Sequence, residues 1–143
     1  MPSEFSLTHR VQFCETDMAG VAHFANYFRW MEEVEHAFFR SLGLNIVMTY
    51  EGAQLSWPRV SASCEYQGSL RFEDEVELRL SLTRVGNKSL AYDIRFLKGA
   101  QPVALGKITA VCVMVDAGEF RAVSIPPAIR EKFRNSGLFA IEA

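Results

Sequence analysis

The thirteen residues from Glu15 to Tyr27 include the side chains best suited to chemistry in this chain. They lie between a strand-like run and a strongly amphipathic stretch, and they contain Asp17 and Gly20. We expect Asp17 to sit in a tight turn that faces the unpaired N–H groups at the start of a helix. A base beside a helix terminus that stabilises anions supplies half of an acyl-transfer site.

Length and charge narrow the possible classes of protein. A chain of 143 residues with 49% hydrophobic residues predicts a single domain, residues 1–143, with a substantial core. The 15 Lys and Arg residues nearly balance the 17 Asp and Glu residues, which argues against nucleic acid or an anionic membrane as a partner. No apolar run approaches the ~20 residues of a membrane span, and the first residues do not resemble a signal peptide.

The cysteines and the missing motifs exclude further classes. Cys14, Cys64 and Cys112 are odd in number and far apart, which predicts reduced thiols and a cytoplasmic location rather than a disulfide framework. The sequence has no Cys-x-x-Cys, no His-x-x-x-His and no glycine-rich phosphate loop. We therefore expect no metal site and no bound cofactor.

Hydrophobic periodicity predicts the elements that position the Asp17 segment. Alternation over residues 5–13 indicates a strand with one buried face. Apolar residues at helical spacing then predict a long helix from near His23 to Leu42, which Gly43 ends. Residues 45–57 are harder to interpret, and we expect a short helix and a loop there.

The remainder of the chain is dominated by strands. Alternating patterns predict strands over residues 60–66, 76–82 and 90–96, and residues 103–115 are apolar in both phases, which favours a central strand. A Pro126-Pro127 pair opens a short terminal helix. The predicted fold is α+β: one mainly antiparallel five-stranded sheet wrapped around a long central helix. Such a small sheet gains by pairing its edge with a second copy of the chain.

Two stretches also carry a resemblance to a known family. They read Val11-Gln12-Phe13-x-x-Thr16-Asp17-x-x-Gly20-Val21 and Asn26-Tyr27-x-x-Trp30-x-Glu32. The pattern resembles the hotdog-fold acyl-CoA thioesterases of the 4-hydroxybenzoyl-CoA thioesterase type, including their YbgC-like branch, and a general similarity extends over nearly the whole chain. The resemblance implies a hotdog domain, an acyl-CoA substrate, no cofactor, and dimers with one continuous sheet and active sites at the subunit interface. Such dimers often pair into homotetramers.

The same resemblance implies roles for individual residues. Asp17 matches the catalytic aspartate, acting as general base or as nucleophile, and the backbone amide of Phe24 matches the group that polarises the thioester carbonyl. Many relatives have aspartate where this chain has Glu15, and the residues before the helix also differ, so the acyl group does not transfer with the family. Aromatic, short-chain and medium-chain acyl groups all remain open, as does a carrier-protein thioester.

Five further residues are candidates for substrate binding. Gly20 permits the turn, and His23 either lines the acyl pocket or is a surface residue at the helix start. Glu32 matches an acid on the family's central helix. Lys88, and after it Arg84, flank a turn where relatives place basic residues for the phosphates of coenzyme A. For each charged residue an ordinary solvated surface position is the competing interpretation.

Two other functions compete with thioester hydrolysis. A hotdog dehydratase or hydratase uses a histidine base with an acid on the central helix, which His23 and Glu32 could imitate. A non-catalytic acyl-CoA or acyl-carrier binding protein has no need of a base such as Asp17. Release of free coenzyme A that depends on Asp17 separates the three functions.

Overall fold

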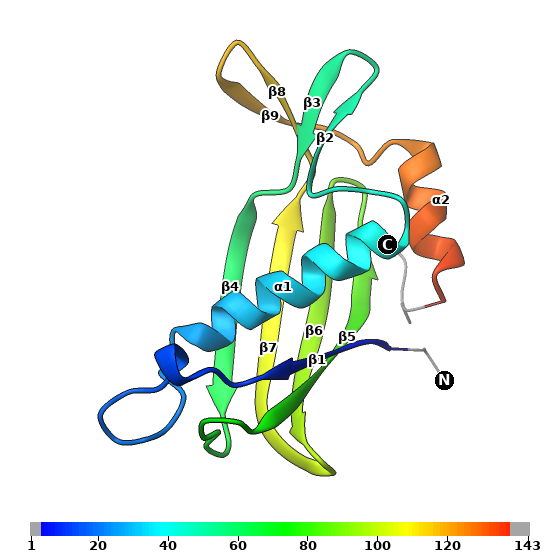
Figure 1. Cartoon of the computed structure of the whole chain (residues 1–143). Helices are drawn as coiled ribbons and strands as arrows, with labels where there is room; N and C mark the ends of the chain where they lie inside the picture. Colours follow the sequence, from blue (N-terminus) through cyan, green and yellow to red (C-terminus); the bar gives the residue numbers. More distant parts are fainter. Residues whose placement is uncertain (1–3, 138–143) are drawn as a thin grey trace.

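A five-stranded antiparallel sheet forms the body of the protein. The structure is a computed structural model that describes residues 4–137. The strand order is β1-β5-β6-β7-β4. The strands are β1 (Phe5–Arg10), β4 (Arg59–Tyr66), β5 (Glu75–Val85), β6 (Ser89–Lys98) and β7 (Gln101–Val111). The long helix α1 (Asn26–Ser41) crosses the inner face of this sheet (Figure 1). The α+β hotdog fold expected from the sequence is confirmed.

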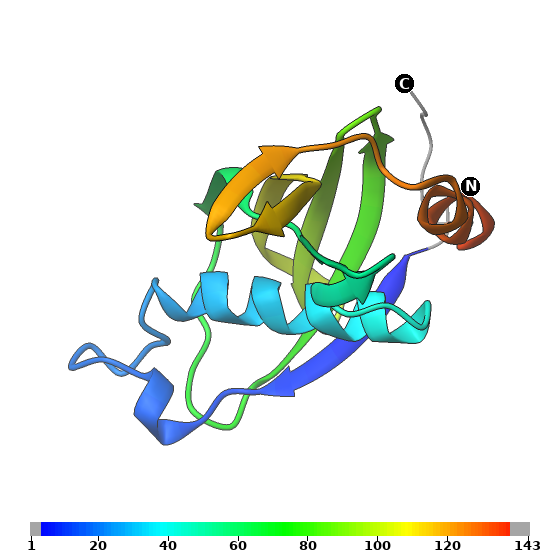
Figure 2. The same cartoon turned by 90° about the horizontal axis from the view of Figure 1, so that it is seen from above.

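Alternation along the strands builds the core. On β5 the residues Leu78, Leu80 and Leu82 are buried towards α1, and Arg79 and Ser81 between them lie on the opposite face and are half-buried. The helix contributes buried side chains three and four positions apart, as in the series Tyr27, Trp30 and Val34. Seen from above, α1 lies along the concave side of the curved sheet (Figure 2). Burial of apolar surface between these two layers is the main source of stability.

A second, smaller sheet was not predicted from the sequence. Its order is β2-β3-β8-β9, with β2 (Val47–Tyr50), β3 (Ala53–Ser56), β8 (Val113–Asp116) and β9 (Glu119–Ala122). The expectation of a short helix and a loop over residues 45–57 is therefore wrong. Leu55 of β3 pairs with Met114 of β8 and is fully buried, so a contact between distant segments decides the structure there.

The apolar run over residues 103–115 is divided between the two sheets. Its first part, β7, has neighbours on both sides, although the central strand is β6. The Cys112 N–H donates to the carbonyl oxygen of Lys88 at 2.7 Å, and the chain passes there into the smaller sheet as β8. The prediction of one strand over the whole run is therefore wrong in extent, whereas the interior position predicted for it holds for β7.

The first strand and the long helix are both shorter than predicted. β1 ends at Arg10 because Val11 pairs instead with the loop before β5: its N–H donates to the Asp74 carbonyl, and its carbonyl accepts from the Glu73 N–H, both at 2.9 Å. A 3-10 turn, η1 (Phe13–Glu15), follows. The terminal helix α2 (Pro127–Asn135) begins at the predicted proline pair. Within residues 4–137, neither helix is long and apolar enough to cross a membrane.

Candidate active site

The loop between η1 and α1 is closed by its own backbone. Thr16 and Ala22 form an isolated antiparallel bridge, and the Asp17 N–H donates to the Val21 carbonyl at 2.9 Å. Gly20 has φ of +82°, a left-handed conformation, and its N–H donates to the Asp17 carbonyl at 3.0 Å. A Cβ at Gly20 would meet nothing within 4 Å, so backbone conformation, not space, favours glycine there.

Asp17 sits at the exposed start of this turn. Its Oδ1 accepts a hydrogen bond from the Ala19 N–H at 2.9 Å, the local bond that aspartate makes in many turns. Within residues 4–137 the other oxygen, Oδ2, accepts no hydrogen bond. One oxygen of Asp17 therefore orients the carboxylate, and the second is free to act on a substrate or a water molecule.

The backbone N–H of Phe24 is the second free group in this loop. The Asn26 N–H donates to the His23 carbonyl at 3.0 Å, so that carbonyl points along α1. In a trans peptide the N–H points opposite to the C=O, which directs the Phe24 N–H away from the helix. It makes no hydrogen bond within the described part of the chain. An unpaired N–H at a helix start is suited to hold an oxyanion.

The Glu15 carboxylate connects this loop to the core. Its Oε1 accepts from His9 Nε2 at 2.9 Å and from the Gln12 N–H at 2.8 Å, and its Oε2 accepts from Trp30 Nε1 at 2.8 Å. Burial alone raises the pKa of Glu15, but these hydrogen bonds outweigh burial and leave the pKa below its ordinary value. Glu15 is therefore ionised at neutral pH and accepts hydrogen bonds from β1, η1 and α1.

The Glu15 backbone holds the other arm of the loop. Its carbonyl oxygen accepts from the His23 N–H and from Asn26 Nδ2, both at 2.8 Å. Sequence reasoning assigned nothing to His9 and noted Glu15 only as a departure from relatives. The sequence offered one signal for a structural role of Glu15: its spacing from Gln12 is that of a capping box.

His23 is occupied by local contacts. Its Nδ1 accepts from the Ala25 N–H at 3.2 Å, and its ring stacks on Phe24 with centroids 4.6 Å apart. With Nδ1 as acceptor, the neutral ring carries its proton on Nε2. His23 is exposed, so it can offer that N–H to a substrate while it caps the helix start.

Glu32 lies on the side of α1 that faces β4. It is exposed, and its negative charge acts on the buried Glu35 and on Arg59 at the start of β4. It stands about 9 Å along the axis from Asn26, at 1.5 Å per residue. The chain by itself therefore does not bring Glu32 to the Asp17 loop.

The turn between β5 and β6, which holds Lys88 and follows Arg84 closely, lies at the opposite end of the sheet from the loop between η1 and α1 (Figure 1). The first residue of β5, Glu75, pairs with Arg10, which comes shortly before the loop that carries Asp17. Lys88 comes three residues after Val85, the last residue of β5. Strand β5 spans roughly 35 Å at ~3.3 Å per residue. A role in binding coenzyme A at the same site requires a second subunit, and it stays a prediction.

Exposed apolar side chains surround the loop on the side of β4. Met18 and Phe24 are exposed, and Phe13, 75% exposed, packs edge-on against Phe72 with centroids 5.7 Å apart. In both views the loop projects on the side where β4 forms the edge of the sheet (Figure 1, Figure 2). These features leave the candidate site open in the isolated chain.

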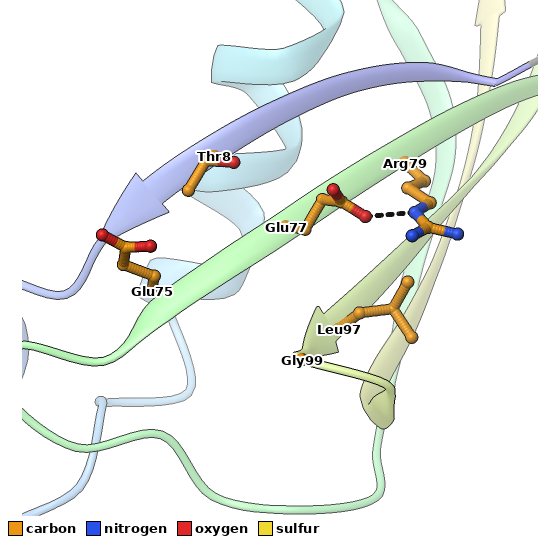
Figure 3. A pocket seen from close by; sticks show the side chains of 6 residues that line it. All are labelled: Thr8, Glu75, Glu77, Arg79, Leu97 and Gly99. Carbon is orange, nitrogen blue, oxygen red and sulfur yellow. Dashed lines mark hydrogen bonds and ion pairs between the residues drawn. The ribbon is translucent and has the colours of Figure 1, made fainter.

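A cavity on the outer face of the sheet does not belong to this site. It has a volume of about 220 Å³ and is lined by Thr8, Glu75, Glu77, Arg79, Leu97 and Gly99 (Figure 3). Glu77 and Arg79 form an ion pair with each other there. The cavity lies on the face away from α1, and Asp17 does not line it.

Comparisons with known proteins agree with the fold. A curved antiparallel sheet wrapped around one long helix is the architecture of the hotdog thioesterases. The chain belongs to the thioesterase-like superfamily, whose family model matches residues 11–133. This membership confirms the resemblance found in the sequence and makes the protein a thioester hydrolase.

Individual relatives cover most of the chain. A putative esterase from Aquifex aeolicus (strain VF5) is 31% identical over 131 residues, which are 92% of this chain and 98% of that protein. A 1,4-dihydroxy-2-naphthoyl-CoA hydrolase from Synechococcus sp. (strain WH7803) is 29% identical, covering 89% of this chain and 86% of that protein. The structure of the gentisyl-coenzyme A thioesterase BH1999 superimposes with a TM-score of 0.74 at 28% identity, covering 91% of this chain and 99% of that one.

Proposed function

We propose that this protein hydrolyses an acyl-CoA thioester to a carboxylic acid and free coenzyme A. The observation that carries the proposal is the pair of free groups on one closed loop: Oδ2 of Asp17 and the N–H of Phe24. Family membership supplies the class of reaction, and this pair supplies a base or nucleophile and an oxyanion donor.

The chemistry follows from the two groups. Asp17 either removes a proton from an attacking water or attacks the thioester carbonyl itself, and the Phe24 N–H stabilises the negative charge that develops on the carbonyl oxygen. The carbon–sulfur bond then breaks and coenzyme A leaves as the thiol. Overall, water supplies the hydroxyl of the acid and the proton of the thiol. No metal or cofactor is needed for this reaction.

The active enzyme in this proposal is a homodimer joined through β4. Among residues 4–137 this strand pairs with β7 alone, and most of its eight residues are exposed, including Val60 at 63%. An open edge of this length is a template for pairing with a second copy. A partner placed there also covers the apolar surroundings of the Asp17 loop and brings a second set of Lys88, Arg84 and Glu32 side chains towards it. Pairing of two such dimers gives a tetramer.

Aromatic acyl groups are our first candidate substrates. The 1,4-dihydroxy-2-naphthoyl-CoA hydrolase and the gentisyl-coenzyme A thioesterase are both named for aromatic acyl groups. The exposed rings of Phe13, Phe24 and Phe72 offer flat apolar surface close to Asp17.

The dehydratase alternative is less well supported by the geometry. It needs a histidine base paired with an acid on α1, but His23 Nδ1 already accepts from the Ala25 N–H. Glu32 lies further along the helix, near Glu35 and Arg59. A pure binding role leaves the free oxygen of Asp17 without a purpose.

Thiol release from a panel of acyl-CoAs tests the proposal. Benzoyl-, 4-hydroxybenzoyl-, acetyl-, hexanoyl- and 3-hydroxybutyryl-CoA are each incubated with the protein, and free coenzyme A is measured with a chromogenic disulfide. We expect release, fastest for the aromatic thioesters. An altered acyl group on an intact thioester would instead identify a dehydratase, and binding without any reaction would identify a binding protein.

A further inference from the structure

We propose that Glu15 is a positioning residue for the hydrolysis, one that fixes the separation between the Asp17 carboxylate and the Phe24 N–H. This inference rests on the proposed function. Glu15 precedes Asp17 by two residues, and its carbonyl oxygen accepts from the N–H of His23, the residue before Phe24. One residue therefore holds both arms of the loop that carries the reacting groups.

The carboxylate ties these arms to rigid parts of the fold. Trp30, which donates to Oε2, is 1% exposed in the second turn of α1, and His9, which donates to Oε1, belongs to β1. His9 also faces Glu33, with Nδ1 3.3 Å from Oε2 of that residue. A residue bound to β1 and α1 at once cannot shift relative to either without breaking a short hydrogen bond.

A neutral side chain of the same size cannot replace the carboxylate. The Gln12 N–H and Trp30 Nε1–H are donors only, and they approach different oxygens of Glu15. A glutamine presents one oxygen and one NH₂ group, so one of these donors must face another donor. The loss of this hydrogen bond to residue 15 allows the loop to move. A displacement of about 1 Å at a reacting group can lower the rate on the order of 10²-fold.

The test compares Glu15→Gln with a matched control, Glu33→Gln. Both substitutions remove one carboxylate that faces His9, but Glu33 makes no contact with the loop among the described interactions. The readouts are kcat and KM for coenzyme A release across a range of pH, together with hydrogen–deuterium exchange of the amides of residues 16–24. Exchange monitors the loop directly and does not depend on activity.

A positioning role predicts a specific combination of results. In Glu15→Gln the plateau value of kcat falls by about 10- to 100-fold, KM changes by less than about threefold, and exchange over residues 16–24 becomes faster. In Glu33→Gln all three stay close to the wild type. If Glu15→Gln does not fold, Glu15→Asp, which keeps the charge but shortens the reach, takes its place with the same expectations.

Several outcomes would overturn the proposal. An unchanged kcat in an active enzyme would remove Glu15 from the mechanism, as would an equal loss in Glu33→Gln. A lower kcat without faster exchange would show that Glu15 acts through its charge and not through the loop. A wild-type protein that hydrolyses no thioester would instead overturn the proposed function, and this inference with it.

Discussion

The sulfur atom of Met31 lies 2.7 Å from the position that a Cβ on Gly106 would occupy. Met31 is fully buried on α1, and Gly106 faces it from β7. The absence of a side chain at Gly106 is therefore what lets the helix and the sheet approach closely at this point. The wrapping of the sheet around α1 depends on this contact as well as on the apolar pattern.

Gly106→Ala tests this packing. The added methyl group must displace a fully buried side chain, and we expect a loss of about 1–3 kcal/mol in the free energy of unfolding. Urea denaturation measures it. The same substitution made in a Met31→Ala background should cost clearly less, because the space is then open. An equal cost in both backgrounds would show that Met31 is not the obstacle.

A buried ion pair predicts a dependence of stability on pH. Glu35 of α1 is fully buried in contact with Arg59 of β4. Burial, with the nearby negative charge of Glu32, raises the pKa of Glu35 from 4.5 to about 8. The folded protein thus holds a proton that the unfolded chain releases, so stability falls as pH rises from about 4.5 to about 8.

Arg59→Met extends this dependence to higher pH, because it removes the cation in contact with the Glu35 carboxyl. We expect the variant to lose about 1 kcal/mol more at pH 9, where Glu35 is mostly ionised in the wild type, than at pH 5, where Glu35 is protonated in both proteins. Urea denaturation at both pH values measures the difference.

Arg95→Met is the control for Arg59→Met. Its partner, Glu4, has a lowered pKa because Arg95 hydrogen-bonds to it, so its titration affects stability only below pH 4.5. We expect a loss under about 1 kcal/mol and no trend between pH 5 and 9. A constant loss in Arg59→Met over this range would contradict the role of Glu35.

The open edge of β4 gives a test of the dimer. The Gln67 N–H donates to the Val103 carbonyl on β7, so by alternation the N–H of Ser63 faces β7 and that of Ala62 faces the open edge. Ala62→Pro removes an edge donor and leaves the pairing with β7 intact. We expect it to shift the protein from dimer towards monomer in analytical ultracentrifugation and to lower activity with it.

Ser63→Pro separates this effect from general damage to the strand. It removes a donor inside the sheet, so its first effect is a lower melting temperature. Ala62→Pro that stays dimeric and folded would show that subunits do not join through this edge.

The sequence predicted the large sheet and α1 well because their apolar residues recur at the period of the element. β5 and β6 each alternate buried and half-buried residues over most of their length. The hairpin of β2 and β3 could not be predicted in this way. Each of these strands has only four residues, and β3 pairs with β8, which is distant in the sequence. The passage from β7 to β8 also depends on a distant partner, the Lys88 carbonyl.

The candidate site also contains features that are local in the sequence and features that depend on contacts between distant segments. The turn that carries Asp17 before the helix could be predicted, because it is a local feature of the sequence, whereas the catalytic roles of Asp17 and the Phe24 amide rest on the family resemblance and stay predictions. The contacts of Glu15 with His9 and Trp30 could not be predicted, because they depend on how β1 and α1 pack. Lys88 and Arg84 were grouped with the site on resemblance, and one chain leaves them at the far end of the sheet.

The rate of coenzyme A release by Asp17→Asn tests the central claim most directly. The amide oxygen of asparagine can still accept from the Ala19 N–H, so the turn should persist. Asp74→Asn is the matched control, since Asp74 is also a turn aspartate and accepts from the Arg71 N–H at 2.8 Å. We predict that Asp17→Asn keeps its fold and loses turnover by a factor on the order of 10² or more, while Asp74→Asn stays near the wild-type rate. Near-normal turnover in Asp17→Asn would contradict the assignment of Asp17 as base or nucleophile.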